Sequence, residues 1–347
     1  MFKIKVPASS ANIGPGFDVL GIGLNLYLEI TLSNDSSDTS KDKHNGKIIY
    51  SGEGKENVPL ETEKNLVTAT ALYVMRCNGM EKFPPGTVIE IHNPIPLGRG
   101  LGSSGAAIVG GSMIGNYYLG NKFSKERLLD YCLLIERHPD NIAAAMLGGF
   151  VGSYLNELDE KETQEKSVPL TSILPKEDTP ATQIVSKPPP HKIGEYLKYN
   201  WNEKIKCIAI IPNFEVSTDD ARSILPSSYE KADIIFNLQR LAILTSSLSQ
   251  DPPNSQLIYN SMKDKLHQPY RSTLIPGLTK ILDTLKPEEN PGLCGICLSG
   301  AGPTILCLAV DNFDQLANKI IDMFKVEGIQ CSWKLLELAY DGATTKN

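Results

Sequence analysis

The first residues of the chain alternate between apolar and polar side chains, and this period of two predicts a strand over residues 1–6. Apolar residues return over residues 19–31, and β-branched residues predict a strand over residues 87–92. Residues 65–77 instead place apolar side chains three and four positions apart, which predicts a helix. Similar patterns predict strands over residues 205–212, 293–298, 304–310 and 330–336, and helices over residues 104–119, 124–137, 140–146, 219–225, 232–247, 256–265, 277–285 and 312–326.

Other segments lack either period. Small and turn-forming residues fill positions 7–18, so we expect a loop that other groups can approach closely. Residues 33–47 are polar, and we expect a mobile hairpin tip there. Residues 156–204 are acidic and lysine-rich and then carry the run Lys-Pro-Pro-Pro at 187–190. This composition predicts a poorly packed insert or an interdomain connection.

The length of the chain predicts how many domains it forms. A chain of 347 residues is long for one compact core and comfortable for two. We expect a first domain over residues 1–160, an insert or connection over residues 161–204, and a second domain over residues 205–347. Because strands and helices alternate near the end of the chain, we expect the second domain to be α+β.

Composition narrows the classes of function. Hydrophobic residues make up 41% and charged residues 21% of the chain, as in an ordinary globular protein. The net charge of −6 argues against a general nucleic-acid surface. No apolar stretch has the length of a membrane span, and the N-terminus lacks the features of a signal peptide. We therefore expect a cytoplasmic protein that binds neither nucleic acid nor a membrane.

Two of the cysteines have the spacing of a metal or redox pair. Cys294 and Cys297 form a C-x-x-C pattern, but no second pair or histidine partner follows. The apolar run over residues 293–298 predicts a buried strand instead. Thiols packed in the core of a protein from a reducing compartment are the favoured interpretation.

A loop rich in glycine and serine at residues 96–106 is the strongest chemical signal. Its G-x-G-x-x-G spacing suits a dinucleotide-binding loop, but residues 93–97 separate it from the preceding strand, and no second strand with an acidic end follows the helix. A nucleophile elbow at Ser104 is the next candidate. It lacks the sharp strand-turn-helix context, and the later histidines have no evident triad partners. Both interpretations fit poorly.

A phosphate-binding loop fits the same residues better. Glycines allow several backbone N–H groups to point at one anion, and the helix that follows presents its positive end to that anion. We expect Ser103 or Ser104 to cap this helix, with hydroxyls able to contact phosphate or Mg²⁺. The spacing is not that of a Walker loop. A loop that only packs a glycine-rich helix closely is the remaining alternative.

The loop resembles the P-x-x-x-G-L-G-S-S-x-A signature of the GHMP kinases and matches it over residues 96–106. Two further blocks of that family occur in the expected order, at residues 7–18 and 298–304. Three ordered blocks spread along the chain are far more specific than one glycine loop. Residues 136–141, 217–222 and 267–271 resemble the homoserine kinase branch of the family.

This resemblance implies a two-domain α+β GHMP kinase fold. The N-terminal domain would be similar to domain 2 of ribosomal protein S5, and the C-terminal domain would be ferredoxin-like. The resemblance implies ATP and Mg²⁺ as cofactors. It also implies transfer of the γ-phosphoryl group of ATP to the side-chain hydroxyl of L-homoserine, on the route to threonine, and a homodimer.

The resemblance also assigns roles around the phosphoryl group. Glu136 extends the apolar stripe of its predicted helix, where a carboxylate needs a partner. By resemblance it is the Mg²⁺ ligand, together with Ser104. Asn141 orients the acceptor hydroxyl, and we assign no general base, since phosphoryl transfer can rely on positioning and charge neutralisation. Asp140 or Asn141 is expected to cap the next helix.

The remaining roles concern the acceptor and the nucleotide. Arg222 and Arg271 supply planar, bidentate partners for an α-carboxylate. By resemblance, Asp18 and Asn12 face the amino group and the hydroxyl, and His138 is a further substrate contact. The nucleotide contacts are Asn65 for adenine, Thr218 near the phosphates (and a candidate cap for the helix that leads to Arg222), and the loop residues Pro96, Leu97, Gly98, Arg99, Gly100, Leu101, Gly102, Ser103, Ser104, Gly105 and Ala106.

Two other functions stay open at this point. One is another GHMP small-molecule kinase, of the mevalonate type. The paired arginines together with Asp18 favour a zwitterionic amino acid over a simple hydroxy acid. The other is a non-catalytic member of the family that binds ATP as a sensor. The presence of Glu136, Ser104 and the third glycine block argues against it.

Overall fold

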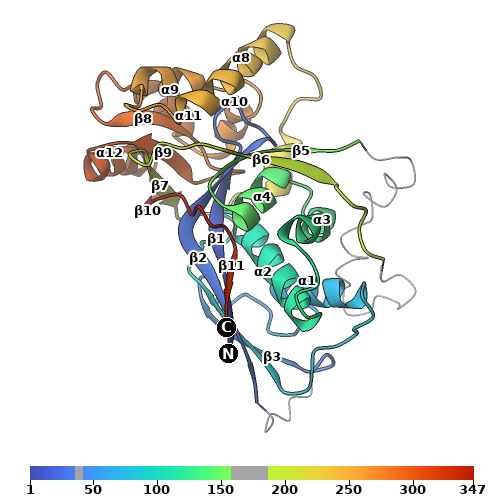
Figure 1. Cartoon of the computed structure of the whole chain (residues 1–347). Coiled ribbons are helices and arrows are strands. Elements are labelled where there is room, and N and C mark those ends of the chain that lie inside the picture. Colours follow the sequence, from blue (N-terminus) through green and yellow to red (C-terminus); the bar gives the residue numbers. More distant parts are fainter. Residues whose placement is uncertain (36–41, 158–186) are drawn as a thin grey trace.

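The computed structural model describes residues 1–35, 42–157 and 187–347. Within them the chain forms two sheets, each packed against helices, and the second sheet lies beyond one end of the first (Figure 1). The predicted two-domain α+β fold is confirmed. One apolar cluster runs from the first domain onto the near face of the second sheet, and a second cluster fills the other face of that sheet.

In the described part of the chain, the first sheet has seven strands and is largely antiparallel. Its order is β11-β1-β2-β4-β3, and β5 pairs with both β2 and β6. Long β2 carries buried Leu28, Ile30 and Leu32 at every second position, which holds one face of the sheet against the core. The strands are β1 (Phe2–Ala11), β2 (Leu20–Asn34), β3 (Gly46–Gly52), β4 (Thr87–Asn93), β5 (Phe150–Leu155), β6 (Gly194–Tyr199) and β11 (Thr344–Lys346).

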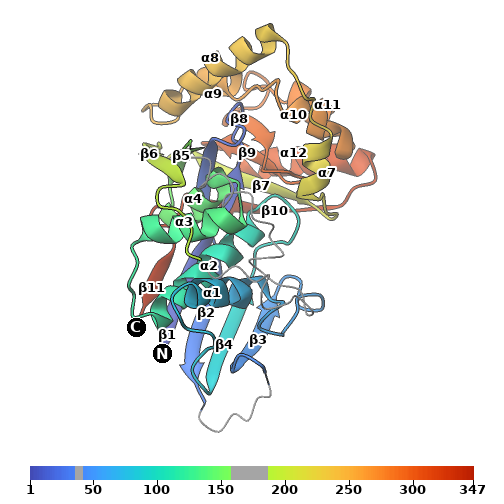
Figure 2. The same ribbon diagram turned by 90° about the vertical axis from the view of Figure 1, so that its right-hand side faces the viewer.

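Helices cover one face of this sheet (Figure 2). The central helix is α2, whose glycines bring it close to its neighbours. A β-carbon on Gly110 would lie 2.7 Å from Cδ1 of Ile30, and one on Gly111 would lie 2.2 Å from the carbonyl oxygen of Val67. The small residues of α2 therefore let it pack directly on the sheet and on α1. The helices are α1 (Leu66–Arg76), α2 (Ser103–Tyr118), α3 (Lys125–Ile135) and α4 (Pro139–Leu147).

The second sheet has four antiparallel strands in the order β10-β7-β9-β8. Its strands are β7 (Lys206–Pro212), β8 (Leu293–Leu298), β9 (Ile305–Ala309) and β10 (Cys331–Leu336). Cys294 and Cys297 lie in β8 as buried, free thiols, as the buried-strand interpretation predicted. The accompanying helices are α7 (Thr218–Ser223), α8 (Lys231–Ser247), α9 (Ser255–Ser261), α10 (Gln268–Arg271), the 3₁₀ turn η2 (Ser272–Leu274), α11 (Leu278–Thr284) and α12 (Phe313–Val326).

Several sequence predictions need correction. Residues 7–11 belong to β1 rather than to a loop. Their backbone pairs with β2, with a register shift between Pro7 and Ala8. The expected hairpin over residues 33–47 is not a hairpin in its described part. β2 continues to Asn34, while β3 begins at Gly46 and pairs in parallel with β4. Residues 36–41 of that prediction lie outside the described residues.

The expected insert over residues 156–204 is also partly wrong. Its last residues form β6, which pairs with β5 in the first sheet. The two terminal guanidinium nitrogens of Arg127 donate to the carbonyl oxygens of Pro190 and Pro189, at 2.8 and 2.7 Å. Asp130, which pairs with Arg127, accepts from the backbone N–H of Ile193. These contacts fix the segment before β6 on α3. Residues 158–186 lie outside the described part of the chain.

Candidate active site

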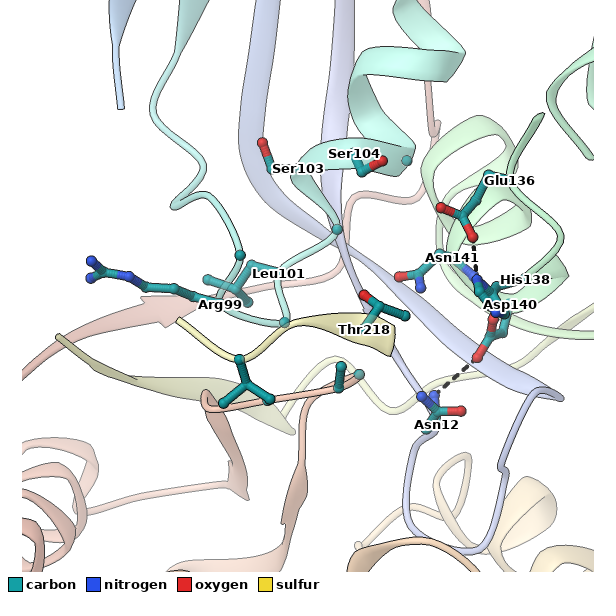
Figure 3. Close-up of a pocket in the computed structure, with 18 of the residues that line it drawn as sticks. Asn12, Arg99, Leu101, Ser103, Ser104, Glu136, His138, Asp140, Asn141 and Thr218 are labelled. Atoms are coloured by element: carbon teal, nitrogen blue, oxygen red, sulfur yellow. Dashed lines mark hydrogen bonds and ion pairs between the residues drawn. The ribbon is translucent and has the colours of Figure 1, made fainter. Parts of the chain in front are cut away.

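A cavity between the two domains gathers most of the residues that the sequence singled out (Figure 3). The first domain contributes the loop after β1, the glycine loop and the start of α4, and the second contributes α7, α10 and the turn between β8 and β9. The predicted residues that line it are Asn12, Asp18, Pro96, Gly98, Arg99, Gly100, Leu101, Gly102, Ser103, Ser104, Gly105, Glu136, His138, Asn141, Thr218, Arg222 and Arg271.

The glycine loop adopts a conformation that requires its glycines. Gly98, Gly100 and Gly102 all have positive φ, at 61°, 79° and 68°. Gly102 immediately precedes α2, and its N-cap position has no side-chain hydrogen bond. The expectation that Ser103 or Ser104 caps this helix is therefore wrong. Both serines open the helix instead, which places their hydroxyls at its positive end.

Three segments far apart in the sequence meet at this loop. The backbone N–H of Ser9 in β1 donates to the carbonyl oxygen of Leu101 at 3.1 Å. On the other side, the hydroxyl of Ser299 donates to the carbonyl oxygen of Gly100 at 2.6 Å, and the backbone N–H of Gly300 donates to that of Ala11 at 2.9 Å. The blocks 7–18, 96–106 and 298–304 thus form one joint between the domains.

Glu136 occupies a different local structure from the one predicted. Helix α3 ends at Ile135, and Glu136 is its extended C-cap residue, so it does not continue the apolar stripe of the helix. Its carboxylate contacts Nδ1 of His138 (Figure 3). Burial lowers the pKa of His138, but the hydrogen bond and negative charge of Glu136 outweigh it, so the pKa is raised. The imidazole therefore holds the carboxylate at the cavity wall.

Asp140 is a site residue that the sequence treated only as a helix cap. The N-cap position of α4 is His138, so neither Asp140 nor Asn141 occupies it. Asp140 is 1% exposed, and its two carboxylate oxygens accept from the backbone N–H groups of Asn141 and Asn12, at 3.0 and 3.2 Å. The amide oxygen of Asn141 accepts from the Ser9 hydroxyl at 3.1 Å. Asp140 thus joins the loop after β1 to the start of α4.

The electrostatic environment of Asp140 disfavours its charged form. Burial is the largest cause and the negative charge of Asp18 the next, and together they raise the pKa of Asp140 to about 7. The charge of His138 and the two backbone hydrogen bonds offset this only in part. The sequence signal that could have found Asp140 is a carboxylate next to an asparagine at the start of a helix, beside the predicted site residues Glu136 and His138.

Two arginines and one aspartate form the charged side of the cavity. Arg222 donates to Oδ1 of Asp18 at 2.7 Å. Arg271 is 1% exposed, and its Nε and one terminal nitrogen donate to the carbonyl oxygens of Ala221 and Gly300, at 3.1 and 3.0 Å. Ser217, rather than Thr218, caps the helix that carries Arg222, because the Ser217 hydroxyl accepts from the backbone N–H of Asp220.

A second cavity adjoins the first and shares Gly98, Ser103 and Ser104 with it. Asn65 lines this second cavity, but its amide is already used: the oxygen accepts from Val67 N–H to cap α1, and the nitrogen donates to the carbonyl oxygen of Pro59. Leu97 also lines it, whereas Ala106 is fully buried in the core and lines neither cavity. The other walls are mostly apolar, from Leu28, Tyr50, Val58, Leu66 and Ala107.

Two family models match parts of this chain. Residues 65–149 match the family model for the N-terminal domain of GHMP kinases, and residues 252–326 match the model for their C-terminal domain. The chain therefore belongs to the GHMP kinase family, whose members use ATP.

Full-length relatives narrow the class further. The chain is 64% identical to the homoserine kinase of Candida albicans and 57% identical to that of Saccharomyces cerevisiae, in each case over 99% of this chain and 98% of the relative. The crystal structure of homoserine kinase from Cytophaga hutchinsonii is 26% identical, with a TM-score of 0.75 over 99% of this chain and 97% of that one. Within the GHMP kinases, the chain belongs to the homoserine kinases.

The described residues contain neither a candidate membrane-spanning helix nor a cluster of potential metal ligands. None of their helices combines the length and the apolar character needed to cross a bilayer. Nor do they contain a group of three or more His, Cys, Asp or Glu side chains placed to hold a metal ion.

The raised pKa of Asp140 makes stability depend on pH. In the unfolded chain the pKa of this carboxyl is about 3.9. Between about pH 4 and pH 7 the folded state therefore binds more protons than the unfolded state. The free energy of unfolding should therefore fall as pH rises through this range, by up to about 1.4 kcal/mol per pH unit from this group. Asp140→Asn should lose that part of the slope in urea unfolding followed at several pH values. Parallel profiles for the two proteins would contradict the assignment.

Proposed function

We propose that this chain is a homoserine kinase that transfers the γ-phosphoryl group of ATP to the side-chain hydroxyl of L-homoserine, in threonine biosynthesis. The reaction forms an O–P bond to the acceptor oxygen and breaks the bond between the γ-phosphorus and the oxygen bridging it to the β-phosphate. The products are O-phospho-L-homoserine and ADP, and the hydroxyl proton is released. One observation supports the proposal most: a single cavity is lined both by the glycine loop and by Asp18, Arg222 and Arg271. The loop suits phosphate groups, and the three charged side chains suit a zwitterion.

The acceptor would lie between the two domains, next to the charged side of the cavity. Arg222 and Arg271 suit an α-carboxylate, because a guanidinium offers planar paired donors. Asp18 suits the ammonium group. Arg222 and Asp18 pair with each other, so a bound zwitterion would exchange one internal ion pair for two contacts of the same kind. Asn12 and His138 would complete the contacts around the acceptor.

Asn141 would orient the acceptor hydroxyl. Its amide lies beside Ser9 in the cavity, and Asp140 fixes its backbone. We assign no general base, since a loose phosphoryl-transfer transition state places little demand on early proton removal. These residues would set the position of the acceptor hydroxyl oxygen relative to the phosphate loop.

The nucleotide would occupy both adjoining cavities. Backbone N–H groups of the glycine loop and the start of α2 would cradle the phosphates, with Thr218 approaching from the second domain. The largely apolar second cavity suits a planar base. Because the Asn65 amide is used in capping α1, its direct adenine contact is less well supported than the contacts from the walls around it.

The donor set also fits a magnesium ion. The Glu136 carboxylate and the Ser104 hydroxyl face the same space (Figure 3), and both are the oxygen ligands that Mg²⁺ prefers. A single carboxylate suffices, since magnesium in such sites is completed by phosphate oxygens and water. When bound, the ion would neutralise charge on the phosphates. Glu136 would then exchange its contact with His138 for the metal.

The alternative functions are less well supported. Mevalonate kinase structures are similar at 12% identity, which bears on the fold alone. A hydroxy acid would also leave Asp18 without an ammonium partner, at a desolvation cost of about 1–3 kcal/mol if it becomes buried. A non-catalytic ATP sensor would not require Glu136 or the acceptor charges. The homoserine kinase proposal accounts for all of these residues together.

A homodimer in the cytoplasm completes the proposal. Helix α8 exposes Ile234, Ile235, Leu238 and Ile243, a concentration of apolar side chains that suits a contact between copies. The seven cysteines are free, as suits a reducing compartment. Sedimentation velocity of the full chain would measure whether it is a dimer. Fluorescence localisation of the tagged protein would measure whether it is cytoplasmic.

A coupled assay of ADP release tests the function. Purified chain with ATP and Mg²⁺ should turn over L-homoserine, with little or no turnover of mevalonate or galactose. The physical reason is that only homoserine offers opposite charges to Arg222 and Asp18 at once. Equal activity with mevalonate would contradict the acceptor site, and no ADP release with any of the three alcohols would favour the sensor.

Glu136→Gln tests the magnesium site. The amide keeps the size of the side chain but loses its charge, so we expect kcat to fall by about 100-fold or more, or about 2.7 kcal/mol. Raising the Mg²⁺ concentration should restore part of the rate. Glu126→Gln, which neutralises an exposed glutamate on α3, is the matched control and should behave as the unmodified chain. Ordinary turnover of Glu136→Gln at ordinary Mg²⁺ would rule out the role.

A further inference from the structure

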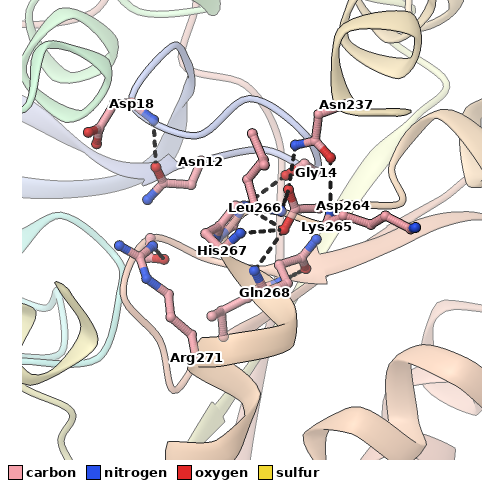
Figure 4. Close-up of polar contacts among 12 residues, drawn as sticks. Asn12, Gly14, Asp18, Asn237, Asp264, Lys265, Leu266, His267, Gln268 and Arg271 are labelled. Carbon is pink, nitrogen blue, oxygen red and sulfur yellow. Dashed lines mark hydrogen bonds and ion pairs between the residues drawn. The ribbon is translucent and has the colours of Figure 1, made fainter. Parts of the chain in front are cut away.

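We infer that His267, a buried residue outside the cavity, is a positioning residue for the acceptor. It fixes the loop over residues 12–18 of the first domain against the second domain, and so sets the places of Asn12, Asp18 and the two arginines. The inference rests on the proposed acceptor site and adds a residue to it that does not itself line the cavity. Figure 4 shows the contacts that carry it.

His267 makes one directed contact across the domain boundary. Its side chain is 0% exposed, and its Nε2 lies 2.9 Å from the carbonyl oxygen of Gly14. A carbonyl oxygen only accepts, so Nε2 must carry the proton. Burial is the main cause that lowers the pKa of His267, and the neutral ring with its proton on Nε2 is the form that results. Its Nδ1 has no hydrogen-bond partner among the described residues.

The backbone that carries His267 is fixed by Asp264 (Figure 4). One carboxylate oxygen of Asp264 accepts from the backbone N–H groups of His267 and Gln268, at 2.9 and 2.7 Å. The other accepts from the backbone N–H of Leu266 at 3.0 Å and from the side-chain amide of Asn237 at 2.6 Å. Asp264 thus holds the start of α10, the helix that ends at Arg271. The position of His267 and that of Arg271 are therefore set together.

The loop over residues 12–18, which His267 contacts, packs closely against the second domain. Gly14 has φ of +54°, and a β-carbon there would lie 2.9 Å from both Cα and the carbonyl oxygen of Met262. Next along the loop, the Phe17 ring stacks on the His267 ring, with centroids 5.3 Å apart. The guanidinium groups of Arg271 and Arg222 lie 5.0 and 5.5 Å from the same Phe17 ring. Phe17 therefore links His267 to both arginines of the acceptor site.

The two acceptor residues of this loop are held in unfavourable backbone conformations. Asn12 and Asp18 have φ of 59° and 56°, in the left-handed region that L residues seldom adopt. Such conformations persist only where the surroundings enforce them. The Asn12 amide oxygen accepts from Asp18 N–H at 2.9 Å, and Asp140 holds Asn12 from the first domain. From the second domain, His267 holds the middle of the loop through its hydrogen bond to Gly14.

This arrangement predicts a selective kinetic effect. Loosening the loop displaces the partners of the acceptor, whereas the glycine loop and α2 are fixed by separate contacts with Ser9 and Ser299. Changes at His267 should therefore raise KM for homoserine and leave KM for ATP nearly unchanged. A residue that served only the stability of the fold would lower the melting temperature without that difference between the two substrates.

The experiment compares steady-state kinetics of two substitutions. His267→Phe keeps an aromatic ring for Phe17 and removes the N–H donor, and it should raise KM for homoserine at least tenfold, with KM for ATP within twofold. His267→Gln keeps a neutral N–H donor, and its KM for homoserine should lie closer to that of the unmodified chain. His191→Phe, at an exposed histidine, is the matched control. Unchanged KM for homoserine in His267→Phe, or equal increases for both substrates, would overturn the inference.

Two further variants keep the test decisive. If His267→Phe does not fold, Phe17→Leu removes the ring between His267 and the arginines at a partly exposed position, and the same selective rise is expected. An unchanged KM for homoserine in Phe17→Leu would then overturn the inference. Arg222→Ala, which removes a proposed direct contact, tests the acceptor site itself. If it raises KM for homoserine and the other variants do not, only the role of His267 fails. If it also leaves KM unchanged, the acceptor site is wrongly assigned.

Discussion

A β-carbon on Gly102 would lie 2.0 Å from the hydroxyl oxygen of Ser9, and one on Gly100 would lie 2.2 Å from the carbonyl oxygen of Ser299. These distances allow no side chain at either position, so the glycine loop contacts β1 on one side and the second domain on the other through its backbone. The same close approach that excludes side chains leaves backbone N–H groups free to face an anion. The proposed phosphate site and the domain joint are therefore formed by the same backbone, so a change in one would change the other.

The charges around this joint are arranged so that each depends on its neighbours. Asp140 is buried beside the negative Asp18, which is unfavourable, and Asp18 is balanced by Arg222 on the other domain. Arg271 is buried with two carbonyl partners and forms no ion pair with a carboxylate in the described part of the chain, and burial lowers its pKa. A ligand with one positive and one negative group can relieve both imbalances.

The sequence predicted which residues line the cavity better than it predicted the helices and strands that carry them. The glycine-rich blocks at residues 7–18, 96–106 and 298–304 were singled out by their spacing, and the structure brings all three together. Glu136 lines the cavity, but it was wrongly predicted to lie on a helix, because the apolar stripe of α3 continues in register for one residue after the helix has ended. Strands β3, β5 and β6 were missed, since partly exposed strands with mixed polarity show no clear period. The contact between His267 and Gly14 joins residues 253 positions apart, and no local pattern reports it.

The short strand β11 brings the end of the chain back to its beginning. Lys346 pairs with Lys3 in the first sheet, and the two termini lie side by side (Figure 1). The second domain is therefore an insertion within the first, joined to it by two covalent crossings, one between β6 and β7 and one between β10 and β11. A domain tethered twice cannot swing freely as one on a single linker does.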